Sequence, residues 1–256
     1  MGAQRRGVGR YGAGMAGGDL REQREALGRR LTQEFDDADV AVEIVTAVDD
    51  SVVAGLVERS DPDLATSPLL SYRPPAVPDA EVDSLWILAF GYRFAEGGAD
   101  AGADGAIPPM SALEPGPVNE ALAREAAAFV DRHPVPIVAQ WEVARVLAEL
   151  GVGEVISVEP DYDDDGSVIY LSTMGVLEKG LRLLDEAGLT AGRAGVLGHA
   201  DHAGRCLMAA RGAGLSAAVP EGVDLPADYD PESGQPWTRS RTNFVPVDLM
   251  VRSLTG

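Results

Sequence analysis

Short apolar runs alternate with longer helical patterns from about residue 84 to the end of this 256-residue chain. The runs are largely apolar and end at glycine, proline or a polar residue, which is typical of strands covered on both faces. Their alternation with helices indicates right-handed βαβ units around a parallel sheet. We predict a three-layer, Rossmann-like α/β domain over 80–256, with helices on both faces and about five mainly parallel strands at 84–90, 135–139, 154–158, 194–197 and 216–219. The predicted helices are 118–132, 141–150, 175–187, 205–212 and 244–254.

The first 18 residues differ from the rest because they contain seven glycines and no apolar periodicity. This composition predicts a disordered tail. Residues 7–12 spell G-x-G-x-x-G, the dinucleotide-binding fingerprint. That fingerprint requires a strand before it and a helix after it, and no strand precedes it here, so we reject it.

Residues 19–79 are predicted to pack on the main domain as a separate segment. Leucines at helical spacing predict an amphipathic helix over 19–35 with Asp19 as its N-cap. The β-branched run 40–48 predicts a strand, followed by a helix over 49–58. Five prolines in 60–80 predict a surface connector, and the Gly-rich and Pro-rich stretch 91–118 predicts a long loop, a candidate lid.

Composition narrows the class of protein. Apolar residues make up 45% and charged residues 24% of the chain, as in ordinary soluble domains. No stretch of 18 uninterrupted apolar residues is present, and the N-terminal arginines lack the apolar core of a secretory signal. The single cysteine, Cys206, rules out an internal disulfide and fits a reducing compartment. We therefore expect a cytoplasmic protein without a membrane partner.

The net charge argues against a nucleic-acid-binding protein. The formal net charge is −20, although residues 1–30 carry seven arginines against three acidic residues. The rest of the chain therefore carries about −24, which would repel the phosphates of a nucleic acid. We expect a small-molecule ligand rather than a nucleic acid, and the residues do not specify an oligomeric state.

Polar side chains follow each predicted strand where the strand ends. Because the carboxyl ends of parallel strands share one edge of the sheet, we expect them to meet in one crevice. The candidate ligand-binding residues are Gly91, Tyr92, Arg93, Asn119, Gln140, Trp141, Glu159, Thr173, Asp201 and Arg205. Arg93 and Arg205 would hold an anionic group.

The candidate catalytic residues are His202, His199 and Glu142. Either histidine would act as general acid or base, while Glu142 and Glu159 would orient a partner or a water molecule. Two alternatives remain open for the histidines. They could bind a metal with a third ligand such as Asp201 or Glu142, or they could cap the helix that follows. We predict no metal site, because the spacing is not distinctive of one.

Three further motifs carry alternatives. Residues 161–166 match half of a calcium loop, but Ser172 stands where the bidentate glutamate belongs, so a solvated acidic turn is favoured. Ser172 and Thr173 either cap the next helix or also present its free N–H groups to an anion. Near the end of the chain lies a cluster of Trp237, Arg239, Arg241 and Asn243. This cluster could close over a planar or anionic ligand, or its arginines could pair with surface carboxylates. Cys206 begins an apolar helical face, which favours a buried, inert thiol.

The order of these motifs resembles the YdcF/SanA-like domain, a bacterial family largely of unknown function. The matching segments, within about 84–220, are Trp141–Ala144, Gly151–Glu159, Ser172–Thr173 and His202–Arg205. The loop 90–93 and the segments 139–141 and 174–175 depart from the family pattern. The resemblance implies S-adenosylmethionine as a possible cofactor and envelope-related roles. We expect a YdcF-like protein that binds a small polar or nucleotide-like ligand at the C-terminal edge of its sheet, with acid–base chemistry or as a non-catalytic binding module. A third alternative is that the charged cluster only caps helices.

Overall fold

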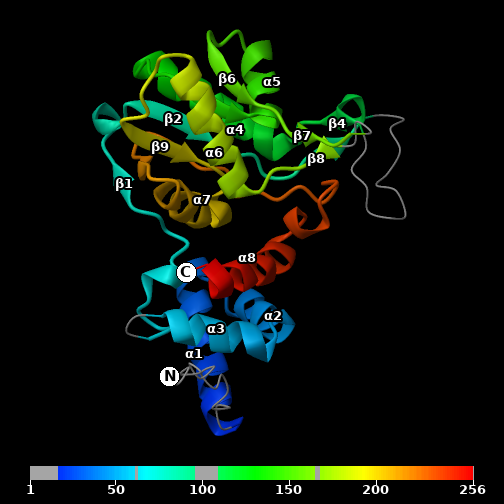
Figure 1. The fold of residues 1–256 in the computed structure, drawn as a ribbon. Helices are drawn as coiled ribbons and strands as arrows, with labels where there is room; N and C mark the ends of the chain where they lie inside the picture. Colours follow the sequence, from blue (N-terminus) through cyan, green and yellow to red (C-terminus); the bar gives the residue numbers. More distant parts are fainter. Residues whose placement is uncertain (1–16, 61–62, 96–108, 165–167, 256) are drawn as a thin grey trace, which may run out of the picture.

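The computed structural model describes residues 17–60, 63–95, 109–164 and 168–255. At its centre is a six-stranded parallel sheet with helices on both faces, so the chain has the predicted Rossmann-like α/β fold (Figure 1). The strands in spatial order are β1 (Ala76–Val77), β10 (Ser216–Pro220), β9 (Arg193–Leu197), β2 (Ser84–Ile87), β5 (Ile137–Gln140) and β6 (Val155–Val158).

Strand β2 is the point at which the chain changes direction across the sheet. From β2 the chain runs outward through β5 and β6, then crosses back to β9 and continues through β10. In sheets of this order, ligands bind beyond the carboxyl ends of the strands at the switch point. The topology therefore places the expected crevice beyond the ends of β2, β5 and β9.

Alternate residues of the central strands enter two different apolar cores. Leu85 and Ile87 belong to one core and Trp86 to the other, as the two-residue period of a strand requires. Helices α4 (Pro117–Arg132) and α5 (Trp141–Glu149) contribute to the first core, and α6 (Thr173–Glu186) and α7 (Ala200–Gly212) to the second. Because both faces are covered, the strands are apolar on both sides.

A layer of helices lies beneath the sheet in Figure 1 and joins the two ends of the chain. It consists of α1 (Gly17–Phe35), α2 (Ala38–Ala47), α3 (Asp50–Arg59) and the C-terminal α8 (Arg241–Thr255). α8 packs against both α2 and α3, and α1 packs against α2. The N-terminal residues are thus tied to the main domain by its last helix.

The predicted strand over 40–48 was wrong, because this segment forms α2. Ala41, Ile44 and Val48 are buried at spacings of three and four residues, while Val42 is exposed. Asp37 caps the helix by accepting a hydrogen bond from the Val40 N–H at 3.0 Å. Packing of this helical face against α1 and α8 overrides the β-propensity of its valines.

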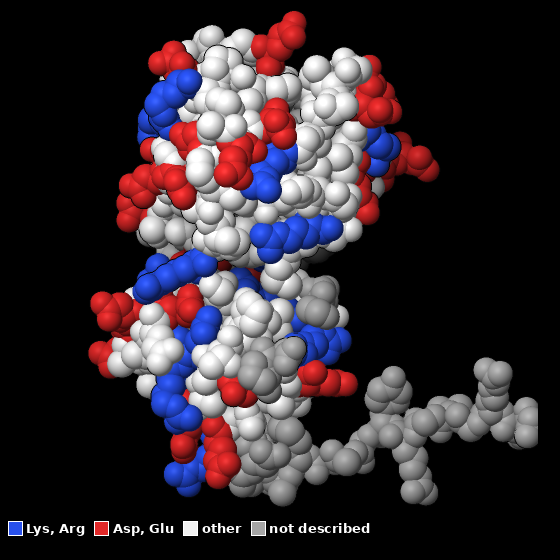
Figure 2. Space-filling model, turned by 90° about the vertical axis from the view of Figure 1, so that its left-hand side faces the viewer, with Lys and Arg blue, Asp and Glu red and all other residues white. Residues whose placement is uncertain are grey.

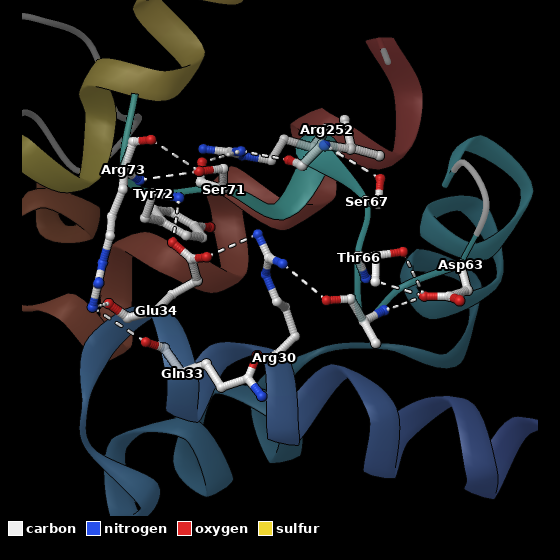
Figure 3. Close-up of polar contacts among 12 residues, drawn as sticks. Arg30, Gln33, Glu34, Asp63, Thr66, Ser67, Ser71, Tyr72, Arg73 and Arg252 are labelled. Atoms are coloured by element: carbon white, nitrogen blue, oxygen red, sulfur yellow. Dashed lines mark hydrogen bonds and ion pairs between the residues drawn. The ribbon is translucent and has the colours of Figure 1, made fainter. Parts of the chain in front are cut away.

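The proline-rich connector is fixed to α1 and α8 by polar contacts (Figure 3). The Tyr72 N–H donates to Glu34 at 2.8 Å, and Arg30 donates to the Ala65 carbonyl oxygen at 2.8 Å. The connector also contains β1, a sixth strand that the prolines did not predict, which pairs with β10 and forms one edge of the sheet. It includes the short 3-10 helices η1 (Pro68–Leu70) and η2 (Asp79–Glu81).

A buried ionic cluster joins the two layers. Asp248 of α8 accepts hydrogen bonds from Arg252 Nε at 2.6 Å, Arg205 Nε at 2.8 Å and the Tyr72 hydroxyl at 2.9 Å. Helix α7 approaches this cluster at Gly204, where a Cβ would lie 3.0 Å from the Ser71 carbonyl oxygen. A larger residue at position 204 would push the layers apart.

The remaining elements are short. β3 (Arg93–Phe94) pairs antiparallel with β4 (Leu113–Glu114), and β7 (Asp161–Tyr162) with β8 (Val168–Ile169). The 3-10 helices η3 (Met110–Ala112) and η4 (Pro236–Thr238) complete the set. The predicted tail up to residue 16 and the middle of the predicted lid, 96–108, lie outside the described residues. Asp19 was predicted as a cap, but α1 begins earlier, at Gly17.

Basic and acidic side chains are interspersed over the face shown in Figure 2. None of the helices in the described part of the chain is long and apolar enough to cross a membrane.

Candidate functional site

A cavity of about 890 Å³ lies beyond the carboxyl ends of β2 and β5 and beside the start of α7. Its walls come from four segments that are distant in sequence: 88–94, 170–173, 202–205 and 234–239. Gln140 and Phe244 complete the lining. The cavity therefore occupies the predicted position, at the switch point of the sheet.

The loop after β2 forms one wall and is held in a tight turn. Gly91 has φ of +75°, and a Cβ there would lie 2.6 Å from the hydroxyls of Ser233 and Thr238. Asn119, fully buried on α4, accepts from the Phe90 N–H at 2.9 Å and donates to the Gly91 carbonyl oxygen at 2.8 Å. Asn119 thus positions the wall from behind and does not line the cavity.

Two positive features meet at the start of α6, where Thr173 and Arg205 line the cavity. Ser172 caps α6 by accepting from the Gly175 N–H at 3.1 Å, which leaves the Thr173 and Met174 N–H groups without partners in the described chain. Arg205 is anchored to Asp248 through Nε, and its Nη1 lies 3.4 Å from Thr173 Oγ1. The guanidinium group therefore stands beside the positive end of the helix dipole.

His202 lies one turn before Arg205 on α7 and lines the same wall. Only 5% of its surface is exposed, and its Nδ1 is buried without a hydrogen-bond partner. Nε2 is therefore the ring nitrogen that reaches the cavity. Burial, reinforced by the nearby Arg205, lowers the His202 pKa well below its ordinary value, so the imidazole is neutral at physiological pH.

The segment around η4 supplies the outer wall. Gln235 is only 7% exposed, yet its side-chain amide has no hydrogen-bond partner among the described residues. Trp237 is exposed, and Arg239 donates from Nε to the Ser233 carbonyl oxygen at 2.7 Å, with its terminal nitrogens unpaired in the described chain. These groups offer unused polar and aromatic surface to a ligand.

A coupled pair lies behind the inner wall. The hydroxyl of Tyr170 donates to Glu142 Oε1 in a short hydrogen bond and accepts one from Gln140 Nε2 at 3.0 Å. Glu142 is fully buried, and its Oε2 has no partner in the described residues. Burial raises the Glu142 pKa to about 8, so the carboxyl group holds its proton at neutral pH.

Six of the predicted residues line the cavity: Gly91, Tyr92, Gln140, Thr173, His202 and Arg205. Others lie behind its walls. His199 caps α7 by accepting from the Asp201 N–H at 3.2 Å, and its ring stacks on Phe90. Of the alternatives for the histidines, these contacts of His199 match the one in which it caps the following helix. Burial lowers the His199 pKa to about 4. Asp201 is bound to Arg241 at 2.7 Å and to the Tyr229 hydroxyl at 2.6 Å, away from the lining.

The remaining predicted residues also point elsewhere. Arg93 forms an ion pair with Asp230 at 2.7 Å. Trp141 is buried beneath Arg145, whose guanidinium lies 4.4 Å from the ring centroid. Glu159 is exposed and accepts from the Ser157 hydroxyl at 2.8 Å. These three do not contribute to the cavity lining.

Sequence reasoning missed Tyr170 and Gln235. Tyr170 follows β8, a two-residue strand with no apolar run, and Gln235 follows no strand at all. The cluster flagged late in the chain gave a partial signal, because Trp237 and Arg239 line the cavity.

No group of three or more potential metal ligands is present among the described residues. Of the half calcium loop, Asp161 forms an ion pair with Lys179 at 2.6 Å, while Asp165 and Gly166 lie outside the described residues. The buried thiol of Cys206 has its pKa raised to about 12 by burial, which fits the inert role predicted for it.

No family model, curated protein or solved structure matches this chain.

Proposed function

We propose that the cavity binds a small, negatively charged molecule that carries a planar ring, as a nucleotide does. The charge of the lining carries this proposal. Arg205 and Arg239 line the cavity, and no Asp or Glu does so among the described residues, in a chain of net charge −20. Cations in a partly enclosed wall are weakly screened and attract an anion strongly.

Shape and surface support the same ligand class. The volume of about 890 Å³ lies within the range of small-molecule sites. The walls carry flat apolar surface that suits an aromatic ring: Phe90, Tyr92, Phe94, Tyr170, Trp237 and Phe244.

The resemblance to the YdcF/SanA-like family suggests S-adenosylmethionine as an alternative ligand. That molecule has a sulfonium and an ammonium group against one carboxylate, so its net charge is positive. Two arginines in the lining disfavour such a cation. We therefore favour a mononucleotide and keep S-adenosylmethionine as a competing probe.

Acid–base catalysis on the bound molecule is a second proposed function. It is favoured by the opposite protonation of His202, which lines the cavity, and Glu142, which lies behind the inner wall. His202 is neutral and can accept a proton through Nε2, while Glu142 is protonated up to about pH 8 and contacts Tyr170. Non-catalytic binding uses the same cavity without this proton transfer.

Isothermal titration calorimetry with AMP, sugar phosphates, succinate and S-adenosylmethionine tests the proposal. We expect AMP to bind and Arg239→Gln to weaken it several-fold, because one of the two cations is lost. Arg124→Gln is the matched control, since Arg124 is exposed on α4 and paired with Glu120. Absence of binding by every probe would refute the proposal.

Recovery of the ligand separates the two functions. If the bound AMP is recovered chemically unchanged after long incubation with excess protein, the binding function stands and catalysis on this probe is excluded. Conversion that disappears in His202→Ala would support catalysis.

A further inference from the structure

We infer that one corner of the cavity is a phosphoryl-binding subsite, so that the ligand is a phosphate monoester. The corner comprises the start of α6 at Ser172 and Thr173 with His202 and Arg205 of α7. This inference rests on the proposed function, because it assigns a chemical class and an orientation to the anion in the same cavity.

The backbone at the start of α6 supplies the first donors. α6 is a helix of 14 residues, and its N–H groups at Thr173 and Met174 have no partner in the described chain. The N-terminus of such a helix binds phosphate through free N–H groups and the positive end of the dipole. The Ser172 hydroxyl is occupied by the Gly175 N–H, so it fixes the turn rather than competing for the ligand.

Arg205 supplies the second donor from a neighbouring direction. Its Nε is held by the buried Asp248 at 2.8 Å, which fixes the plane of the guanidinium group. Its Nη1 lies 3.4 Å from Thr173 Oγ1, so the cation is beside the free N–H groups of the helix. A guanidinium that is anchored from behind loses little freedom when its outer nitrogens bind a phosphate oxygen.

His202 is an independent observation that points to a ligand. Its side chain lines the cavity with only 5% of its surface exposed, and neither ring nitrogen has a hydrogen-bond partner among the described residues: Nδ1 is buried, and Nε2 is on the cavity side. A buried polar group without a partner is costly unless a ligand or water satisfies it. In its Nε2–H tautomer, the neutral imidazole can donate one hydrogen bond to a phosphoryl oxygen without repelling Arg205, whereas the Nδ1–H tautomer is the one that would accept a proton there.

The number of these donor groups favours phosphate over carboxylate. A phosphate monoester has three terminal oxygens in a tetrahedral arrangement, whereas a carboxylate has two in one plane. Three separate groups, the helix start, the guanidinium and the imidazole, line the corner, so each can donate to one of the three oxygens. In another segment of the lining, the unpartnered amide of Gln235 and the ring of Trp237 remain for the planar end of the ligand.

Calorimetry with AMP, adenosine, inorganic phosphate and succinate tests the subsite. We expect AMP to bind at least about tenfold more tightly than adenosine, and inorganic phosphate to compete with AMP better than succinate does. Arg205→Gln should weaken AMP by about ten- to a hundredfold and leave adenosine unchanged.

A second variant covers the case in which Arg205→Gln does not fold, since Arg205 also binds Asp248. Thr173→Pro removes the N–H at the first helical position, where proline is tolerated, and the preceding Ser172 is already extended with ψ of 162°. Thr173→Ala, the matched control, keeps this N–H. We expect Thr173→Pro to weaken AMP about fivefold relative to Thr173→Ala, with equal thermal stability.

The outcomes separate the subsite from the cavity. Equal affinities for AMP and adenosine, stronger competition by succinate than by phosphate, or equal affinities of Thr173→Pro and Thr173→Ala for AMP would overturn the subsite while ligand binding stands. Absence of binding by all four probes and S-adenosylmethionine would overturn the proposed function and the subsite together.

Discussion

Two fully buried carboxyl groups, Asp248 and Glu142, have opposite surroundings. Asp248, between the sheet and the helical layer, is bound by Arg205, Arg252 and the Tyr72 hydroxyl. Glu142, behind the cavity, has the Tyr170 hydroxyl and no ion pair in the described chain. One carboxylate is neutralised by cations from its own protein, and the other keeps a proton. Between the sheet and the helical layer, the charged groups therefore stabilise the fold by pairing with one another. Behind the cavity, a carboxyl oxygen of Glu142 has no partner in the described chain.

The largest expected effect comes from breaking the cluster around Asp248. Asp248→Ala leaves Arg252, which is 1% exposed, as a buried cation without its carboxylate. Removal of one partner of a buried ion pair costs about 3–5 kcal/mol, and we expect this loss in the free energy of unfolding from urea titrations. Asp248→Asn, which keeps the shape and one acceptor, should lose less. A loss below about 1 kcal/mol for Asp248→Ala would contradict the structural role.

The next largest effect concerns how the free energy of unfolding depends on pH through Glu142. The unfolded chain releases this proton near pH 4.5, while the native chain holds it to about pH 8. The native state therefore binds more protons between these values, and the free energy of unfolding should fall as pH rises through them, by at most about 1.4 kcal/mol per pH unit.

Glu142→Gln should flatten this fall, because the amide mimics the protonated carboxyl and does not titrate. We expect equal stability of the variant and the wild type near pH 4 and greater stability of the variant near pH 9. Glu159→Gln, at an exposed carboxylate, is the control. Parallel stability curves for Glu142→Gln and wild type would show that Glu142 does not retain its proton.

A smaller effect is expected at Tyr170. Tyr170→Phe removes the hydroxyl that donates to Glu142 and accepts from Gln140, which should cost about 0.5–1.5 kcal/mol at neutral pH. The hydroxyl also lowers the Glu142 pKa in the native chain, so its loss should leave the start of the fall in stability near pH 4.5 and extend its upper end to higher pH. Chemical denaturation at several pH values measures both changes. A shift to lower pH would contradict the assigned hydrogen bond.

The smallest effect is expected at an exposed carboxylate. Glu232 Oε2 lies 2.9 Å from Arg93 Nη2, and the Glu232 side chain is 76% exposed. Exposed ion pairs contribute little because water and salt screen them, so Glu232→Gln should change the free energy of unfolding by less than about 0.5 kcal/mol. A loss comparable to that of Asp248→Ala would remove the distinction between buried and exposed carboxyl groups.

The five main strands could be predicted because they are short, apolar runs bounded by turn residues. Two segments could not. Residues 40–48 contain valines that favour a strand, yet contacts with α1 and α8 make them a helix. Ala76 and Val77 stand between prolines, yet they add to the sheet because the edge of β10 is free to pair. In both cases partners distant in sequence decided the local structure.

By itself, the sequence determined the order of the main strands and helices from residue 84 onward and the edge of the sheet where polar residues gather. Both follow from the local period of apolar positions and from the parallel direction of the strands. Only the tertiary structure decided which polar residues line the cavity. Arg93 is paired with Asp230, which is 137 residues away, whereas Arg205 is anchored at Asp248 with nitrogens still available. Hydrogen bonds between distant segments set these orientations, and no local pattern records them.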